Sequence, residues 1–136
     1  FLARVADEAA RLLELIQDLL SLARIESAEL RLEPVAVPLD RAIAACLERH
    51  ATRAEAKTLT LVEKPPADGP VAALADADAL RHVLDNLVDN AIKYTPNGGR
   101  ITVRWSAAGG QVGFEVQDTG IGIAEADQPR IFERFY

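Results

Sequence analysis

The stretch LDNLVDNAIKYTP, Leu84–Pro96, places an apolar stripe and a row of polar side chains on one predicted helix. Its leucine, valine and alanine residues recur every three or four positions, which is the spacing of the buried side of a helix. Asn86, Asn90 and Lys93 follow one another at intervals of four and three residues, so they share a different face. Two asparagines one turn apart contribute little to helix stability. On this helix alone, a solvated polar face is the simpler interpretation.

The residues around this stretch set the bounds of the helix and predict the elements beside it. Asp76 or Asp78 is expected to begin the helix, and the turn-forming run Thr95–Gly99 ends it after Tyr94. Three further helices are predicted: one at 2–30, one that is capped by Asp40 and runs to about Ala56, and one at 125–135. Strands are predicted at 35–37, 58–63, 71–74, 100–106 and 111–117. Helices that alternate with hairpin strands predict an α+β fold, a two-layer α/β sandwich in which helices cover one face of a mixed sheet.

The predicted first helix is a separate amphipathic element. Its apolar residues follow alternating steps of three and four, broken only by Glu26, as in a coiled coil or a bundle, and they are Val5, Ala9, Leu12, Ile16, Leu19, Ala23 and Leu30. The apolar face is widened by Leu13, Leu15, Leu20 and Leu22. A face of this width needs more than one neighbouring helix, as in a four-helix bundle. Glu33-Pro34 ends the helix, so we expect two domains, residues 1–32 and 33–136.

The composition excludes some classes of function. Lys and Arg number 15 against 21 Asp and Glu, and the formal net charge is −6. A nucleic-acid surface needs clustered Lys and Arg, so no nucleic-acid partner is expected. The single cysteine, Cys46, is expected to fill space in the core, and the lack of a disulfide framework fits the cytoplasm. No apolar run approaches the roughly 20 residues that a membrane-spanning helix needs.

A glycine-bearing loop, Asp118–Ile123 (DTGIGI), follows the second strand of the predicted hairpin. A lone Gly-x-Gly is more often a plain turn than a site. Here a carboxylate at the end of an apolar strand precedes it, and the glycines permit a ligand to approach the backbone closely. The order of polar helix, hairpin and Gly-x-Gly loop is much more specific than any one of the three, and it favours a binding site.

In this order the segments resemble those of sensor histidine kinases. Leu84–Pro96 is similar to the asparagine box of that family, Asp118–Ile123 to its first glycine box and Arg130–Tyr136 (RIFERFY) to its phenylalanine box. Leu22–Ser27 (LARIES) resembles the end of the second helix of the family's dimerisation domain. The resemblance spans nearly the whole chain.

The resemblance implies a fold and a domain arrangement. Residues 33–136 would form the catalytic ATP-binding domain, with the histidine-kinase/gyrase-type fold, preceded by a long bundle helix. Residues 1–32 would be the second helix of the dimerisation and histidine-phosphotransfer domain. The acceptor helix is expected before Phe1, and the second glycine box with its lid is expected after Tyr136. The catalytic domain is therefore expected to be incomplete at its C-terminal end.

The resemblance implies roles in nucleotide binding for the polar residues of the helix. Asn90 would ligate Mg²⁺ through its amide oxygen, a donor that suits a hard cation. Lys93 would meet phosphate charge, and Tyr94 would line the nucleotide site. Asn86 stands where gyrase-type ATPases carry a glutamate that activates water. An amide cannot act as a general base, so Asn86 favours phosphotransfer over hydrolysis.

The remaining implied nucleotide-binding residues belong to the loop and to the C-terminal box. Asp118 would accept a hydrogen bond from the adenine amino group, which selects adenine over guanine. Gly120 and Gly122 would let the backbone close over the nucleotide. Ile123 and Phe135 are assigned to the same site.

The histidines of this chain match no acceptor motif. His50 and His82 both lack the acceptor pattern of the family, and each is expected to be an ordinary histidine. No catalytic residue is therefore expected within the chain, and the segment alone is expected to show little or no kinase activity.

The resemblance thus implies the ATP-binding portion of a sensor histidine kinase, with ATP and Mg²⁺ as cofactors. The whole protein would transfer the γ-phosphoryl group to a histidine and then to an aspartate of a response regulator. It would be a homodimer through its N-terminal helix, with this part in the cytoplasm and the whole protein anchored in the cell inner membrane. The alternative is a non-catalytic dimerisation and signalling module with a vestigial nucleotide site.

Overall fold

The computed structural model describes residues 1–26 and 31–132. The chain divides into two compact units, Phe1–Leu32 and Glu33–Tyr136, which are described separately. The predicted helical residues 27–30 and the site residue Phe135 lie outside the described residues.

The first unit contains α1 (Leu2–Glu26), a single helix with no buried residue. Its exposed apolar side chains are those that predicted a bundle, and they include Leu12, Ile16, Leu19 and Leu20. Leaving so many apolar groups in water forgoes the stabilisation that burial gives. That this helix packs against further helices stays a prediction.

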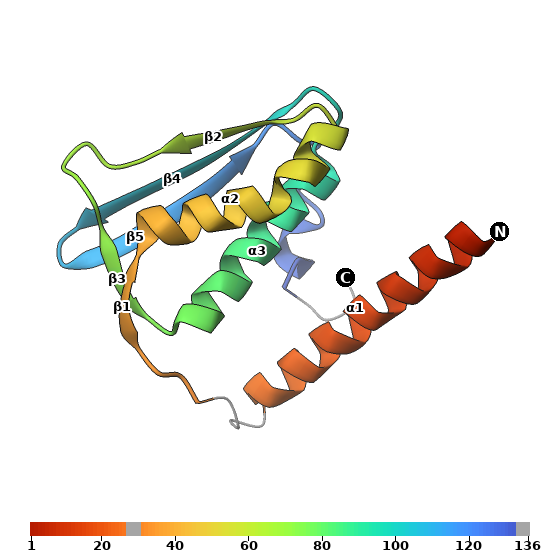
Figure 1. Cartoon of the computed structure of the whole chain (residues 1–136), viewed down its shortest axis with the longest axis horizontal. Helices are drawn as coiled ribbons and strands as arrows, with labels where there is room; N and C mark the ends of the chain where they lie inside the picture. The colour runs from red at the N-terminus through yellow and green to blue at the C-terminus, as the bar shows by residue number, and fades with distance from the viewer. Residues whose placement is uncertain (27–30, 133–136) are drawn as a thin grey trace. The chain divides into compact units, whose positions relative to one another are not determined.

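The second unit is an α+β fold built around a mixed sheet (Figure 1). The sheet has the order β2-β4-β5, formed by β2 (Thr60–Lys64), β4 (Arg100–Ala108) and β5 (Gln111–Asp118). β2 runs parallel to β4, and β5 pairs antiparallel with β4 in a hairpin. A second, antiparallel pair joins β1 (Val35–Pro38) to β3 (Ala72–Ala75). The helices α2 (Leu39–Ala56) and α3 (Ala77–Tyr94) lie side by side and cover one face of the three-stranded sheet (Figure 1).

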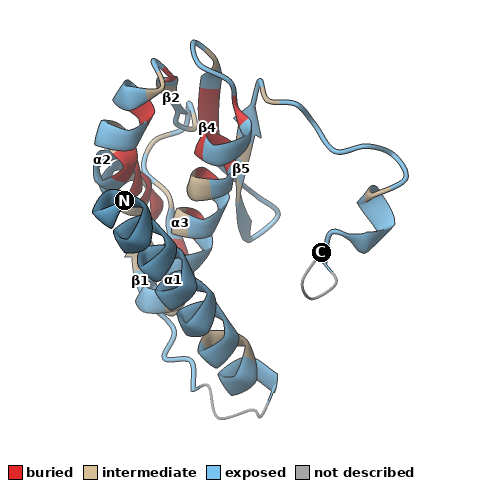
Figure 2. Ribbon diagram, turned by 90° about the vertical axis from the view of Figure 1, so that its right-hand side faces the viewer, coloured by how far each residue is buried: buried red, intermediate tan, exposed pale blue. Residues whose placement is uncertain are grey.

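The core lies between these two helices and the central strand. Ile101, Val103 and Trp105 alternate along β4 and are buried, because alternate residues of a strand point to the same face. They belong to one cluster with Leu84 and Val88 of α3. Figure 2 shows that the buried segments gather on α2, α3 and β4. This arrangement confirms the predicted two-layer sandwich with a mixed sheet.

Two aspartates that the sequence placed at helix starts have different roles. Asp76 is the N-cap of α3 and accepts hydrogen bonds from the backbone N–H groups of Ala79 and Glu33, both at 2.9 Å. Asp40 is not a cap, so that prediction is wrong. Pro38 occupies the N-cap position of α2, and the Asp40 carboxylate instead accepts a 2.9 Å hydrogen bond from the indole N–H of Trp105.

The predicted final helix at 125–135 is wrong over the residues that the structure describes. Residues 125–132 form turns around a single 3₁₀ turn, Gln128–Arg130. Pro129 has no N–H to donate, so an α-helix that began at Glu125 would lose the hydrogen bond from residue 129 to the carbonyl group of residue 125.

None of the helices in the described part of the chain combines the length and the apolarity that crossing a bilayer requires.

Candidate functional site

The C-terminal end of α3 and the glycine loop after β5 are joined by a backbone hydrogen bond. The N–H of Ile121 donates to the carbonyl oxygen of Tyr94 at 3.2 Å. This bond brings together two segments that are far apart in sequence, and each carries predicted site residues. Two apolar side chains of these segments are open to solvent: Tyr94 is 58% exposed and Ile123 is 53% exposed.

Gly120 is required where the loop meets the helix. A Cβ atom at this position would lie 2.5 Å from the Tyr94 carbonyl oxygen and 2.9 Å from Oδ1 of Asp118. Gly122 meets no such neighbour but has a φ of +72°, a conformation that side chains rarely adopt. The two glycines therefore serve different purposes: Gly120 permits close packing, and Gly122 permits the turn.

Asp118 is the last residue of β5 and is held in a defined orientation. Its Oδ1 accepts a 2.9 Å hydrogen bond from the N–H of Gly120, and its backbone pairs with Ile101 of β4. Thr119 adds two bonds to Arg100, one through the backbone at 3.1 Å and one through its hydroxyl oxygen, which accepts from the Arg100 N–H at 3.0 Å. The carboxylate is exposed at the edge of the sheet, where it can accept a donor from a ligand.

The polar face of α3 presents the other predicted site residues. Asn86, Asn90 and Lys93 are all exposed, as the helical spacing predicted. The Lys93 ammonium lies 3.3 Å from Oδ2 of Asp89, one turn earlier on the same helix. This ion pair fixes a positive charge beside the asparagines.

Asp89 also ties this face to α2, because Arg53 donates to its Oδ1. One turn earlier, Arg49 binds Asp85 in the same way at 2.7 Å. Burial alone would raise the pKa of Asp89, but the hydrogen bonds and charges of Arg53 and Lys93 outweigh it and hold the pKa below its ordinary value. The two ion pairs fix the rotation of α3 about its axis, so that its asparagines face outward.

Sequence reasoning missed this pair of ion pairs. A signal was present, because the two arginines of α2 and the two aspartates of α3 are each spaced by four residues. What the sequence could not supply was the pairing of these two helices, which depends on the whole fold.

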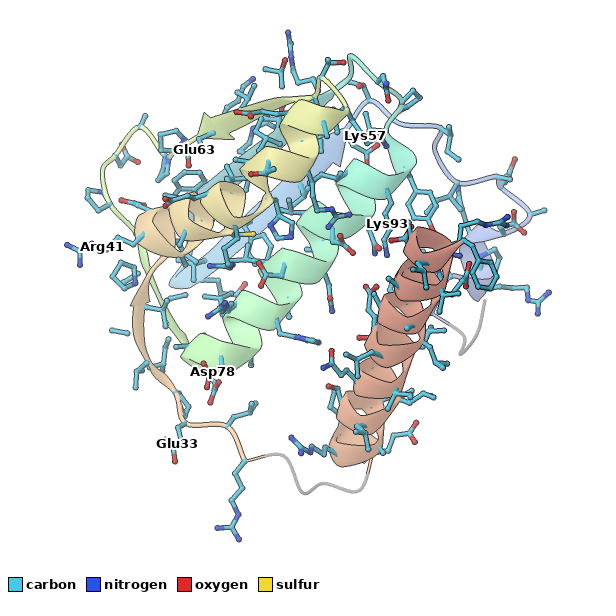
Figure 3. All side chains as sticks on the ribbon, turned by 45° about the vertical axis from the view of Figure 1, so that its right-hand side comes forward. Glu33, Arg41, Lys57, Glu63, Asp78 and Lys93 are labelled. Atoms are coloured by element: carbon cyan, nitrogen blue, oxygen red, sulfur yellow. The ribbon has the colours of Figure 1, made fainter. Side chains whose placement is uncertain are left out.

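The last turn of α3 is also held by hydrogen bonds to its carbonyl groups. Lys57, labelled in Figure 3, follows α2 and donates through Nζ to the carbonyl oxygens of Ile92 at 2.6 Å and Lys93 at 3.4 Å. A cation at this end of a helix also interacts favourably with the helix dipole. The buried Thr95 hydroxyl donates to the Ala91 carbonyl at 2.6 Å. The helix end that carries Asn90, Lys93 and Tyr94 is therefore rigidly placed.

The structure thus joins the two segments that carry most of the predicted site residues. Four lie on α3 and four lie on or beside the loop that is bonded to it: Asn86, Asn90, Lys93 and Tyr94, and Asp118, Gly120, Gly122 and Ile123. Chemically, the set combines amide oxygens, an ammonium group, an oriented carboxylate and an exposed aromatic ring. Such a set can hold a ligand that has a phosphate end and a hydrogen-bonding base.

Comparisons with known proteins find similar sequences and structures. The sequence model of the family described as "Histidine kinase-, DNA gyrase B-, and HSP90-like ATPase" matches residues 75–136. The sensor-like histidine kinase SenX3 of Mycolicibacterium smegmatis is 35% identical over 136 residues, which are 100% of this chain and 35% of SenX3. The chain therefore spans about a third of the length of this relative.

Two solved structures extend the agreement to the fold. ShkA in complex with AMPPNP superposes with a TM-score of 0.81 and 34% identity, over 90% of this chain and 26% of ShkA. The histidine kinase ThkA in complex with the response regulator protein TrrA superposes with a TM-score of 0.77 and 25% identity, over 96% of this chain and 38% of that chain. The chain is therefore similar over its whole length to part of a sensor histidine kinase, and residues 75–136 match the histidine kinase-, DNA gyrase B- and HSP90-like ATPase model.

Proposed function

We propose that residues 33–136 form the ATP-binding domain of a sensor histidine kinase and that residues 1–32 belong to its dimerisation domain. The observation that carries this proposal is the bond between Ile121 and Tyr94, which joins the oriented Asp118 carboxylate to the helix end that bears Asn90 and Lys93. In the whole protein, a histidine nitrogen would attack the γ-phosphorus of ATP and ADP would leave. The phosphoryl group would then pass to an aspartate of a response regulator, the kind of partner that ThkA binds in its solved complex.

In this proposal, different site residues bind the base and the phosphate groups of the nucleotide. Asp118 accepts the adenine amino group, and Tyr94 and Ile123 provide apolar surface for the base. Lys93 meets phosphate charge. Gly120 and Gly122 shape the backbone under the nucleotide, and Phe135 is assigned to the same site from the sequence alone.

Asn90 is the proposed Mg²⁺ ligand. Its amide oxygen is a hard donor on an exposed helix face, and Mg²⁺ characteristically keeps several waters and binds phosphate oxygens at its other positions. Bound Mg²⁺ would neutralise phosphate charge. Asn86, one turn earlier, offers an amide where a hydrolytic enzyme would need a general base, which supports transfer to a side chain rather than to water.

The acceptor histidine would come from outside these residues. His50 is 9% exposed and its Nδ1 hydrogen-bonds to the Cys46 carbonyl, so it does not offer a free nitrogen to solvent as an acceptor histidine must. His82 is exposed on α3 but lies on the helix that carries the binding residues. We therefore expect this segment alone to bind nucleotide without phosphorylating itself.

The exposed apolar face of α1 supports a homodimer of the whole protein through this helix. ATP is the cytoplasmic phosphoryl donor, which supports a cytoplasmic location for this part, with the whole sensor held in the cell inner membrane. Sedimentation of the chain at increasing concentration tests the dimer, because a monomer at all concentrations would contradict it.

Calorimetric titration with a non-hydrolysable ATP analogue tests the proposed site. Asp118→Asn should weaken ATP binding at least tenfold, since it removes the carboxylate acceptor, and should narrow the preference for ATP over GTP. Glu115→Gln is the matched control, because it removes an exposed carboxylate from the same strand, one that lies 3.6 Å from Arg104. Asn90→Ala should remove the Mg²⁺ dependence of binding. If the unsubstituted chain shows no saturable binding, the nucleotide site is vestigial and the chain is a signalling module only.

A further inference from the structure

A second cluster of side chains lies between α2 and α3, and the proposed nucleotide chemistry does not use it. Sγ of Cys46 lies 3.9 Å from Nδ1 of His50, and this nitrogen lies 3.9 Å from Oδ1 of Asp85. All three atoms lie within 4.8 Å of one another. Within the described residues, no other group of three such side chains has this geometry.

The three donors form a set that suits zinc. Zinc binds sulfur, imidazole nitrogen and carboxylate oxygen in tetrahedral geometry, with bonds of about 2.0–2.3 Å. Bonds of this length at a tetrahedral angle separate neighbouring donor atoms by about 3.5 Å. The observed separations, 3.9 Å for two of the pairs and within 4.8 Å for the third, therefore need small side-chain movements. Cys46 and His50 are also four residues apart on α2, a spacing that puts two ligands on one helix face.

The surroundings can hold a ligand set of this kind in place. Arg49 donates to Oδ1 of Asp85 at 2.7 Å and 3.2 Å, and ligating carboxylates are characteristically hydrogen-bonded in this way. His50 would exchange its 2.8 Å hydrogen bond to the Cys46 carbonyl for the metal. Cys46 is 1% exposed, whereas the Asp85 side chain is 30% exposed, so an ion and a water can enter from the side of the carboxylate.

We propose that Cys46, His50 and Asp85 bind one Zn²⁺ ion, with water as the fourth ligand, and that this ion ties α2 to α3. Binding converts the thiol to a thiolate, and its proton is released to solvent. The site is chemically distinct from the Mg²⁺ site, because Mg²⁺ prefers oxygen ligands and near-ideal octahedral geometry. Asp85 directly precedes Asn86, so a bound ion would hold the helix that carries the nucleotide-binding face.

Titration of the whole chain with Co²⁺, a spectroscopic substitute for Zn²⁺, tests the proposal first. A thiolate-to-cobalt charge-transfer band should appear and saturate at one equivalent, and added Zn²⁺ should abolish it. Zn²⁺ but not Mg²⁺ should also raise the thermal unfolding midpoint. This measurement needs no variant, so it does not depend on whether a substituted chain folds.

Variants then identify the ligands. Cys46→Ala, Cys46→Ser and Asp85→Asn should each weaken Zn²⁺ binding at least tenfold and should lose the midpoint shift. His82→Ala is the matched control on α3 outside the cluster, and it should bind Zn²⁺ like the unsubstituted chain. Absence of the thiolate band, or binding that His82→Ala abolishes and Cys46→Ala retains, would overturn the proposal.

Discussion

At Gly120, both the fold of the loop and the proposed nucleotide binding depend on the absence of a Cβ atom. The Cβ of an alanine there would lie 2.5 Å from the Tyr94 carbonyl oxygen, which is backbone and cannot move aside cheaply. We predict that Gly120→Ala lowers the free energy of unfolding by about 1–3 kcal/mol, the usual cost of forcing extra volume into a packed site. Nucleotide binding should weaken with it, because Asp118 is bonded to the Gly120 amide. Urea denaturation and calorimetric titration measure the two effects.

Gly113 is the matched control for this substitution. It lies on β5, a Cβ there would meet nothing within 4 Å, and its φ is outside the left-handed region. Gly113→Ala should therefore be neutral or stabilise the fold by up to about 1 kcal/mol, through the loss of unfolded-state freedom. Equal stability of the two alanine variants would contradict the packing role of Gly120.

At this scale, the sequence predicted the outward-facing residues of the site better than the residues that hold them. Asn86, Asn90 and Lys93 share a face because helical geometry alone requires it. The close approach of Gly120 to Tyr94, and the ion pairs of Asp85 and Asp89 with arginines of α2, depend on contacts between distant segments. Spacing along the chain does not determine those contacts.

At the scale of the element, three carboxylates attach the helix α3 to the rest of the fold, and their pKa values are lowered in the folded state. At Asp85, burial opposes the shift, and hydrogen bonds from Arg49 and Cys46 outweigh it. At Asp76, the backbone N–H groups of Glu33 and Ala79 lower the pKa. At Asp89, burial again opposes the shift, and the hydrogen bonds and charges of Arg53 and Lys93 lower the pKa.

These shifts predict an acid-sensitive attachment of α3. A carboxylate whose pKa is lower in the folded state stabilises the fold above its unfolded pKa, here about 3.8, and this contribution is lost as the pH falls through the lower folded value. The urea midpoint should therefore drop as the pH falls below 3.8. A chain with both Asp85→Asn and Asp89→Asn should be less stable at neutral pH but should show a shallower acid decline. Parallel declines in the two chains would contradict the role of these ion pairs.

The last turn of α3 gives a second prediction at the scale of the element. Lys57→Ala should cost about 0.3–1 kcal/mol, because Lys57 caps the carbonyl groups of Ile92 and Lys93. Amide hydrogen exchange should accelerate in this turn and at Gly98, whose N–H donates to the Lys57 carbonyl. Lys64→Ala, at the exposed end of β2, is the control and should change neither quantity. Faster exchange spread evenly over the unit would indicate a general loss of stability instead.

Local sequence signals located most elements, and they failed where a distant partner or a proline intervened. The helix from Asp76 to Tyr94 and the hairpin of β4 and β5 follow from periodicity and turn residues. Asp40 looked like a cap because aspartate is a common cap, but the buried Trp105 indole needs a hydrogen-bond acceptor and takes that carboxylate. The predicted final helix failed at Pro129.

At the scale of the whole molecule, the composition and element order predicted the fold class but not the strand order. The parallel pairing of β2 with β4 joins residues that are 40 positions apart, such as Thr60 and Arg100. That pairing is decided by which faces can be buried together around Ile101 and Val103. The sequence showed that these residues are apolar, but it could not show which strand lies beside them.

The division of the chain into two units predicts that the second unit is independently stable. Among the residues that the structure describes, the buried core residues lie between Leu39 and Trp105, and α1 has none. A chain of residues 31–136 keeps the Glu33 amide that binds Asp76, and its free energy of unfolding should stay within about 0.5 kcal/mol of the full chain. Leu84→Ala in the full chain should cost about 2–5 kcal/mol, which shows that the assay detects loss of core packing. The shortened chain should also retain nucleotide affinity, because every described site residue lies after residue 85. A shortened chain that fails to fold would show instead that α1 supplies stability through contacts that its exposure does not reveal.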